Sequence, residues 1–232
     1  VRIEGWSPFV PTDADSSSMP AGAVEYQFRN VGSSTVEAVF SFNAKNFLRH
    51  NEDRTVNSIK KISNGFVLAS KAIPDKKHPQ ADFAIFTDQP ETVVDHCWFR
   101  GGWFDPLTIA WDTIRSGNVK SVEPVDHGAP GASLFVPFKL AAEETKTIRV
   151  MTVWYVPESD SRFGGDEKAD DTCGTEAGCC VTSEELGVKI GDEKYLAGNY
   201  KPWYSRRFSD VNAVASFFQK NYDDLRSRSK LF

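Results

Sequence analysis

The fold class follows from residues 6–42, WSPFVPTDADSSSMPAGAVEYQFRNVGSSTVEAVFSF. Residues 23–28 and 36–42 alternate apolar with polar side chains, which is typical of strands with one buried face. Between them, Asn30–Ser34 has the composition of a hairpin turn. Residues 6–20 contain three prolines together with Asp and Ser, which predicts a loop and excludes a helix or an inner strand. The stretch therefore predicts a loop followed by a β-hairpin with one covered face.

Up to residue 157 the chain continues as short apolar segments separated by turn residues. Residues 132–140 and 146–156 form a second predicted strand pair, and Asn64-Gly65 marks a turn between two other strands. Strands that recur about every 8–12 residues favour a sandwich over a parallel α/β sheet. The predicted fold class is all-β and mainly antiparallel: a two-sheet β-sandwich over residues 1–157, with long connections and a C-terminal helix. Its remaining strands are predicted at residues 1–4, 59–62, 66–69 and 82–87.

The last segment, residues 209–232, changes from strand to helix periodicity. Ser209 and Asp210 supply an N-cap, and the cations near the end of the segment suit the negative end of the helix dipole. The segment is therefore predicted to be a helix. Its apolar face consists of Val211, Val214, Ala215, Phe218, Tyr222 and Leu225.

Residues 158–208 form a long excursion and connector with a different composition. Between residues 157 and 196 there are eleven acidic and four basic residues. A long segment of this kind is typical of a lid, a binding loop or a linker. The spacing of its three cysteines, without a nearby His, is a weak zinc pattern. A local disulfide is favoured in an exported protein, ahead of free thiols, with a metal site last. The disulfide candidates are Cys173, Cys179 and Cys180.

Composition excludes several classes of partner. The chain has 27 Lys and Arg against 32 Asp and Glu, a formal net charge of −5, which argues against nucleic acid and anionic membranes. No apolar run approaches the ~20 residues of a membrane-spanning helix. No motif predicts a cofactor. The start at Val1 has no signal-peptide pattern, so the sequence leaves the compartment open, export included.

The most site-like stretch is Val93–Pro106, which places aromatic side chains, carboxylates, a guanidinium and a His around a Gly pair. Carbohydrate sites combine exposed aromatic faces with such hydrogen-bonding groups. The alternative, that the aromatic side chains fill the core between two sheets, is favoured. Asp126-His127 is interpreted as a polar loop, since a catalytic dyad needs spatial convergence and a nucleophile. The candidate substrate-binding residues are Trp98, Arg100, Trp103 and Trp111.

Several short motifs follow one another in a particular order. They are WSPFVPTDAD at 6–15, SMP at 18–20, PGASL at 130–134, VWYVP at 153–157, GNY at 198–200 and RFSD at 207–210. In this order the sequence resembles the amino-terminal domain of the non-lysosomal glucosylceramidases, a family that includes bile-acid and bacterial β-glucosidases (glycoside hydrolase family 116). The resemblance covers nearly the whole chain.

The resemblance implies a non-catalytic β-sandwich that braces a helical (α/α)6 barrel and shapes its entrance. In that family the barrel carries two catalytic carboxyl residues and hydrolyses β-glucosides or glucosylceramide with retention of configuration. No catalytic residue is therefore predicted in this chain. The aspartates of the site-like region lie in strand-edge or turn contexts that are typical of solvated carboxylates: Asp95, Asp105, Asp112 and Asp126.

The resemblance also implies strands upstream of residue 1, so the sandwich is expected to lack its first strands. The terminal helix is expected to lead toward the barrel, with part of the Phe217, Phe218 and Tyr222 surface uncovered. Two alternatives to a bracing domain remain: an autonomous carbohydrate-binding module and a structural interaction module.

Overall fold

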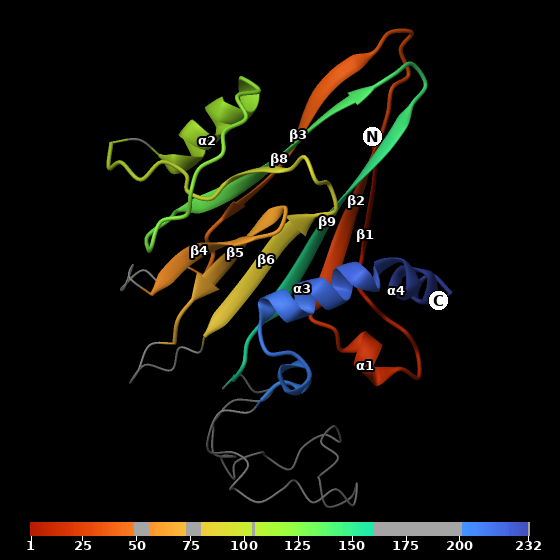
Figure 1. Cartoon of the computed structure of the whole chain (residues 1–232), viewed down its shortest axis with the longest axis vertical. Coiled ribbons are helices and arrows are strands. Elements are labelled where there is room, and N and C mark those ends of the chain that lie inside the picture. The colour runs from red at the N-terminus through yellow and green to blue at the C-terminus, as the bar shows by residue number, and fades with distance from the viewer. Residues whose placement is uncertain (49–55, 73–79, 104, 160–200, 232) are drawn as a thin grey trace, which may run out of the picture.

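The computed structural model describes residues 1–48, 56–72, 80–103, 105–159 and 201–231 (Figure 1). Its strands are β1 (Arg2–Trp6), β2 (Ala21–Arg29), β3 (Val36–Lys45), β4 (Asn57–Ile62), β5 (Gly65–Ser70), β6 (Ala81–Thr87), β7 (Val93–Asp95), β8 (Gly131–Leu140) and β9 (Thr145–Tyr155). Its helices are α1 (Ala14–Ser17), α2 (Pro106–Arg115), α3 (Val211–Lys220) and α4 (Tyr222–Ser229), with a 3-10 turn at Trp203–Arg206.

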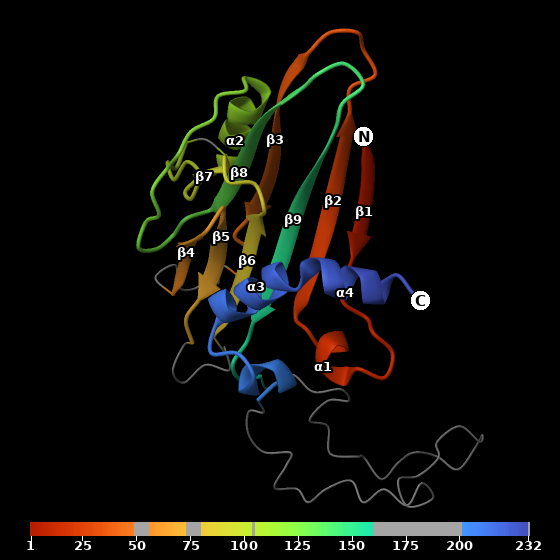
Figure 2. The same ribbon diagram turned by 45° about the vertical axis from the view of Figure 1, so that its right-hand side comes forward.

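These strands form two sheets that pack face to face. The large sheet has the order β1-β2-β9-β6-β5-β4, and the small sheet has the order β3-β8-β7. Paired strands within each sheet are antiparallel. The core between the sheets includes Phe66, Leu134 and Val150. The other face of the large sheet is covered by α3 and α4, with Phe218 and Val153 in a second core (Figure 2). The predicted two-sheet β-sandwich with a C-terminal helix is confirmed.

The two predicted strand pairs are wrong as hairpins, although their strands are correct. β2 lies in the large sheet between β1 and β9, whereas β3 pairs with β8 in the small sheet. Likewise, β8 lies in the small sheet and β9 in the large sheet. Residues 30–35 and 141–144 are therefore arches that cross from one sheet to the other. The apolar faces therefore meet across the core, where the ring centroids of Tyr26 and Phe40 are 4.8 Å apart. An alternating strand has one apolar face whether it pairs with the next strand in a hairpin or faces it across the core, so alternation does not distinguish the two arrangements.

The buried side chain of Asn30 holds the two arches together. Its Nδ2 donates to the carbonyl oxygens of Ser34 at 2.8 Å, Leu140 at 3.1 Å and Ala141 at 2.9 Å. Its backbone N–H donates to the carbonyl of Glu144 at 3.0 Å. The acceptors come from both arches, so a single residue satisfies backbone groups at the point where the chain leaves each sheet.

The predicted turn at Asn64-Gly65 is a true hairpin. Ile62 is opposite Gly65 across the connection, and Asn64 adopts a left-handed φ of 54°. Gly65 is required here, because a Cβ at this position would lie 2.1 Å from the carbonyl oxygen of Ile85. The tight turn keeps β4 and β5 in one sheet, in contrast to the longer arches.

Residues 6–20 are a loop with one exception to the prediction. Ala14–Ser17 forms a single helical turn, α1, because Asp13 accepts a hydrogen bond from the Ser16 N–H at 3.0 Å and caps it. The prolines lie on either side of this turn and do not disturb it.

The C-terminal segment is helical as predicted, and the N-cap at Asp210 is confirmed by its hydrogen bond from the Ala213 N–H at 2.9 Å. The expectation of uncovered aromatic rings is wrong for two of the three residues. Phe218 and Tyr222 are buried in the core over the large sheet, while Phe217 is partly exposed. The two helices are therefore part of the sandwich's own core.

The disulfide candidates Cys173, Cys179 and Cys180 lie outside the described residues, as does most of the excursion at 158–208. Within the described ranges Cys97 is a free thiol. No cluster of His, Cys, Asp and Glu in those ranges could hold a metal ion. None of the described helices has both the length and the apolar character needed to cross a membrane.

Candidate functional site

The site-like segment runs from the small sheet to α2 and places its first tryptophan in the core. Trp98 is 4% exposed, and its indole N–H donates to Ser133 Oγ at 2.8 Å. Its ring lies over Gly131, where an added Cβ would come within 2.5 Å of the ring. Trp98 therefore fills the core, as the favoured alternative predicts, and presents no face to a ligand.

The other three candidate residues lie at the surface. Trp103 is 83% exposed and Trp111 is 63% exposed. Arg100 is exposed and donates from Nη1 to the carbonyl oxygen of His127 at 3.3 Å. Trp111 lies on α2, which begins after Asp105 because that side chain accepts from the Thr108 N–H at 3.2 Å. The four predicted residues thus divide into one core residue and three surface residues.

A groove of about 550 Å³ separates the C-terminal end of α2 from β3 and β8. Its walls combine apolar side chains with charged side chains that are already paired. Lys139 Nζ is 2.5 Å from Glu37 Oε1, and Arg115 Nη2 is 2.8 Å from Asp112 Oδ1. The apolar lining residues include Val39, Ile114, Pro137 and Phe138.

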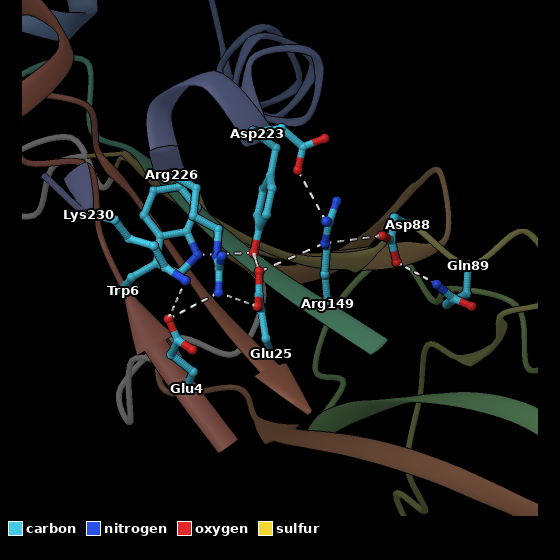
Figure 3. Close-up of polar contacts among 10 residues, drawn as sticks. Glu4, Trp6, Glu25, Asp88, Gln89, Arg149, Asp223, Arg226 and Lys230 are labelled. Atoms are coloured by element: carbon cyan, nitrogen blue, oxygen red, sulfur yellow. Dashed lines mark hydrogen bonds and ion pairs between the residues drawn. The ribbon is translucent and has the colours of Figure 1, made fainter. Parts of the chain in front are cut away.

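A second polar arrangement, which we call the charge row, crosses the outer face of the large sheet. Glu4 on β1 is opposite Glu25 on β2, and Glu25 is opposite Arg149 on β9. Arg226 of α4 lies over the row, with its Nη2 3.0 Å from Glu4 Oε1 and 2.6 Å from Glu25 Oε2 (Figure 3). Lys230 adds a contact of 3.2 Å to Glu4. These cations neutralise two carboxylates that would otherwise repel each other across the strands.

Tyr222 completes the attachment of α4 to the charge row. Its hydroxyl donates to Glu25 Oε1 at 2.8 Å and accepts from the Trp6 indole N–H at 3.0 Å. The guanidinium of Arg149 lies 4.6 Å from the centre of the Tyr222 ring and also contacts Asp223 at 3.1 Å. Burial raises the pKa of Tyr222, with a further rise from Glu25. The phenol is therefore held in its neutral form as a donor.

One comparison with known proteins decides the family. The model of the glycosyl-hydrolase family 116 N-terminal domain, described as beta-glucosidase 2, matches residues 1–225. The chain belongs to this family. No curated protein sequence matches the chain.

Because the chain belongs to a glycoside hydrolase family, the two neighbouring glutamates were compared with a catalytic pair. A retaining glycosidase needs two carboxyl groups about 5–5.5 Å apart, one of which acts as a general acid. Glu4 and Glu25 are close because both contact Arg226 Nη2, at 3.0 and 2.6 Å. However, the hydrogen bond from Lys230 lowers the pKa of Glu4, and Glu25 already accepts from Tyr222 and Arg226. Both carboxylates are thus engaged by cations or donors, and the pair serves as an ionic contact.

Three of the four aspartates singled out in the sequence of this family 116 domain have local roles. Asp105 caps α2, and Asp112 pairs with Arg115. Asp95 accepts from the Cys97 N–H at 2.9 Å, and burial raises its pKa. Asp126 lies in a polar connection, as predicted.

Sequence reasoning missed both the groove and the charge row. The groove depends on α2, and its signal was present as Asp105 followed by Pro106, an N-cap followed by the residue preferred at the first helical position. The charge row depends on strand register, which places Glu4, Glu25 and Arg149 side by side although they are far apart in sequence. No local pattern contains that information.

Proposed function

We propose that this domain of a glycoside hydrolase is the non-catalytic N-terminal β-sandwich of a retaining β-glucosidase. It braces a helical (α/α)6 catalytic domain of the same protein and shapes the entrance to the active site, where β-glucosides or glucosylceramide are hydrolysed. The family 116 match supports the assignment to this enzyme class.

The observation that carries the non-catalytic role is the state of the carboxylates. Glu4 and Glu25 lie opposite each other on β1 and β2, and both are held by Arg226. A general acid needs a carboxyl group that is protonated near neutral pH, and the pKa of Glu4 is lowered. The site thus supports attachment of α4 rather than bond cleavage.

The test is incubation of the purified chain with 4-nitrophenyl β-glucoside, which should release no nitrophenol. Turnover that is lost on Glu4→Gln, Glu25→Gln or Asp95→Asn substitution would contradict the proposal and place an active site in the sandwich. The bracing role is tested by producing the helical catalytic domain with and without this domain. We expect a lower melting temperature and lower kcat/KM without it, and unchanged values would exclude bracing.

A second candidate function, carbohydrate binding, is favoured by one observation. Trp103 and Trp111 expose most of their indole surface, and Trp111 lies on the helix that borders the groove. A non-catalytic domain can carry such a site without any conflict with the bracing role.

A further inference from the structure

The strand β3 forms an open edge of the small sheet. Within the part of the chain that the structure describes, β3 pairs with β8 alone. Asn46, which directly follows β3, donates its backbone N–H to the carbonyl oxygen of Pro130 at 2.8 Å, and so continues the register of β3 with β8. Bonded and non-bonded pairs alternate in an antiparallel ladder. The even-numbered residues of β3 therefore bond to β8, and the odd-numbered residues direct their backbone groups to the open edge.

The partner strand agrees with this alternation. Pro137 has no N–H, and it lies opposite Val39, in a pair that exchanges no hydrogen bonds. The register of β3 with β8 is continuous, and β3 contains no proline, so neither a bulge nor a proline protects the edge. Free N–H and C=O groups thus line the edge over its whole length, at Glu37, Val39, Ser41, Asn43 and Lys45.

The large sheet continues beyond this edge and leaves an apolar shelf uncovered. β3 packs over β2, where the ring centroids of Tyr26 and Phe40 are 4.8 Å apart, and β1 lies on the far side of β2 (Figure 2). Ile3 of β1 is opposite Tyr26 in the register and shares its face of the sheet. Ile3 is nevertheless 62% exposed. A strand added to β3 would lie about 10 Å above β1, the usual distance between packed sheets, and would cover Ile3.

A second copy of the sandwich does not fit this space. If two β3 strands paired across a two-fold axis, the β2 strand of each copy would still lie below its own β3. That position is already taken by β1 of the other copy, because β1 extends one strand beyond β2. The shelf therefore has room for one added strand and not for another large sheet.

Charges at the two ends of β3 set the direction of the added strand. Glu37 and Lys45 are exposed, whereas Phe40 and Phe42 face the core between the sheets. Opposite charges directly across two strands attract each other. An antiparallel partner strand therefore begins with an acidic residue opposite Lys45, ends with a basic residue opposite Glu37, and places apolar side chains over the shelf in between. Lys139 contacts Glu37 at 2.5 Å from the β8 side, so the new base would lie on the carboxylate's open side.

We propose that the open edge of β3 binds one extended segment of a partner polypeptide, which adds to the small sheet as an antiparallel strand above Ile3. Its recognition pattern is an acidic residue, then alternating apolar residues, then a basic residue. This interaction surface is additional to the bracing role and does not depend on it. The sequence EAVFSFNAK, residues 37–45 of β3 itself, has this pattern and supplies the probe.

The experiment is amide hydrogen exchange of the ¹⁵N-labelled chain, followed by NMR, with and without this nonapeptide. The peptide is acetylated and amidated, and it is used at concentrations where it is monomeric by itself. In the free chain we expect slow exchange at Phe40 and Phe42 and fast exchange at Val39, Ser41 and Asn43. Saturating peptide should slow the exchange of these three amides by at least about tenfold, because they acquire acceptors on the added strand.

A second peptide and two variants of the chain are the controls. The peptide with its first and last residues exchanged has the same composition but places like charges opposite each other, so it should bind at least about threefold more weakly. Ser41→Pro removes an N–H from the middle of the open edge without removing a hydrogen bond to β8, and it should abolish binding. Ser41→Ala keeps that N–H and should bind like the parent chain. If Ser41→Pro fails to fold, the exchanged peptide still tests the inference with the parent chain.

Three results would overturn the inference. The first is unchanged exchange at Val39, Ser41 and Asn43 at the highest peptide concentration. The second is equal affinity for the two peptides, which would exclude the charge-directed antiparallel register. The third is a free chain that sediments as a dimer with these amides already protected, because a second copy would then occupy the edge. Each result leaves the proposed function untouched, since that function is tested by turnover of the β-glucoside.

Discussion

Replacement of Arg226 by Met tests whether the charge row fastens the C-terminal helices to the sheet. Met retains much of the apolar stem but leaves Glu4 and Glu25 facing each other without their shared cation. Breaking a fully buried ion pair costs about 3–5 kcal/mol, and an exposed pair about 0–1 kcal/mol. Arg226 is 20% exposed and Glu25 12% exposed, so we expect a loss of about 2–3 kcal/mol, between these limits.

The assay is urea unfolding followed by circular dichroism, with the free energy of unfolding obtained by linear extrapolation. The melting temperature should fall by about 4–12 °C for a chain of this size. Arg228→Met is the matched control on the same helix, because Arg228 is 38% exposed, and it should lower the free energy of unfolding clearly less than Arg226→Met. A second substitution sharpens the test. Glu4→Gln should cost less stability in Arg226→Met than in the parent chain, because the Arg226 contact is already absent there while the contact with Lys230 is lost in both.

Two results would refute this reasoning. Equal losses for Arg226→Met and Arg228→Met would show that the charge row contributes no more than an ordinary surface pair. An equal loss on Glu4→Gln in both backgrounds would show that Arg226 and Glu4 are not coupled.

Three further predictions concern the core and its titration. Phe218→Ala should lower the free energy of unfolding by about 3–5 kcal/mol because the ring is fully buried, whereas Phe217→Ala next to it should cost clearly less in the same urea assay. Gly131→Ala should cost about 1–3 kcal/mol, because the added Cβ would lie 2.5 Å from the Trp98 ring, and a fluorescence shift of buried tryptophan should accompany the loss. The folded state holds the proton of Tyr222 more firmly than the unfolded state, since burial raises its pKa. The stability that Tyr222 adds by keeping its proton is therefore complete below the ordinary tyrosine pKa of about 10 and is lost as the pH rises above it. Tyr222→Phe should accordingly reduce the fall of the urea midpoint at alkaline pH.

The sequence was sufficient for the strands and the fold class because these depend on local alternation and turn residues. Residues 36–42 and 132–140 belong to strands as predicted, and the capping of the last helix by Asp210 was local as well. Strand pairing was not predictable in this way. Asn30–Ser34 has hairpin composition, yet Asn30 uses its side chain to bond carbonyls of the second arch, more than 100 positions away in the chain. A turn residue and an arch residue have the same local preferences.

The sequence also could not predict which tryptophans of the site-like segment are buried. Trp98 and Trp103 lie five positions apart in the same aromatic stretch, and one is 4% and the other 83% exposed. The difference arises from Gly131, whose missing side chain leaves space for the Trp98 ring. Pairing of β7 with β8 brings this segment alongside that glycine's strand. The partner that decides burial is thus supplied by topology and not by the segment itself.

The two arches also explain why the ends of the chain meet. Because β2 pairs with β9 instead of β3, the register aligns Glu25 with Arg149 and leaves the other edge of β2 for β1 and Glu4. Had β2 and β3 formed the hairpin that their alternation allows, Arg226 and Tyr222 would have no such row to contact. The contacts of the C-terminal helices with the sheet therefore depend on this register. The side chains of α4 donate to Glu4 on β1 and to Glu25 on β2, so α4 can form all of these bonds only where β1 and β2 lie side by side.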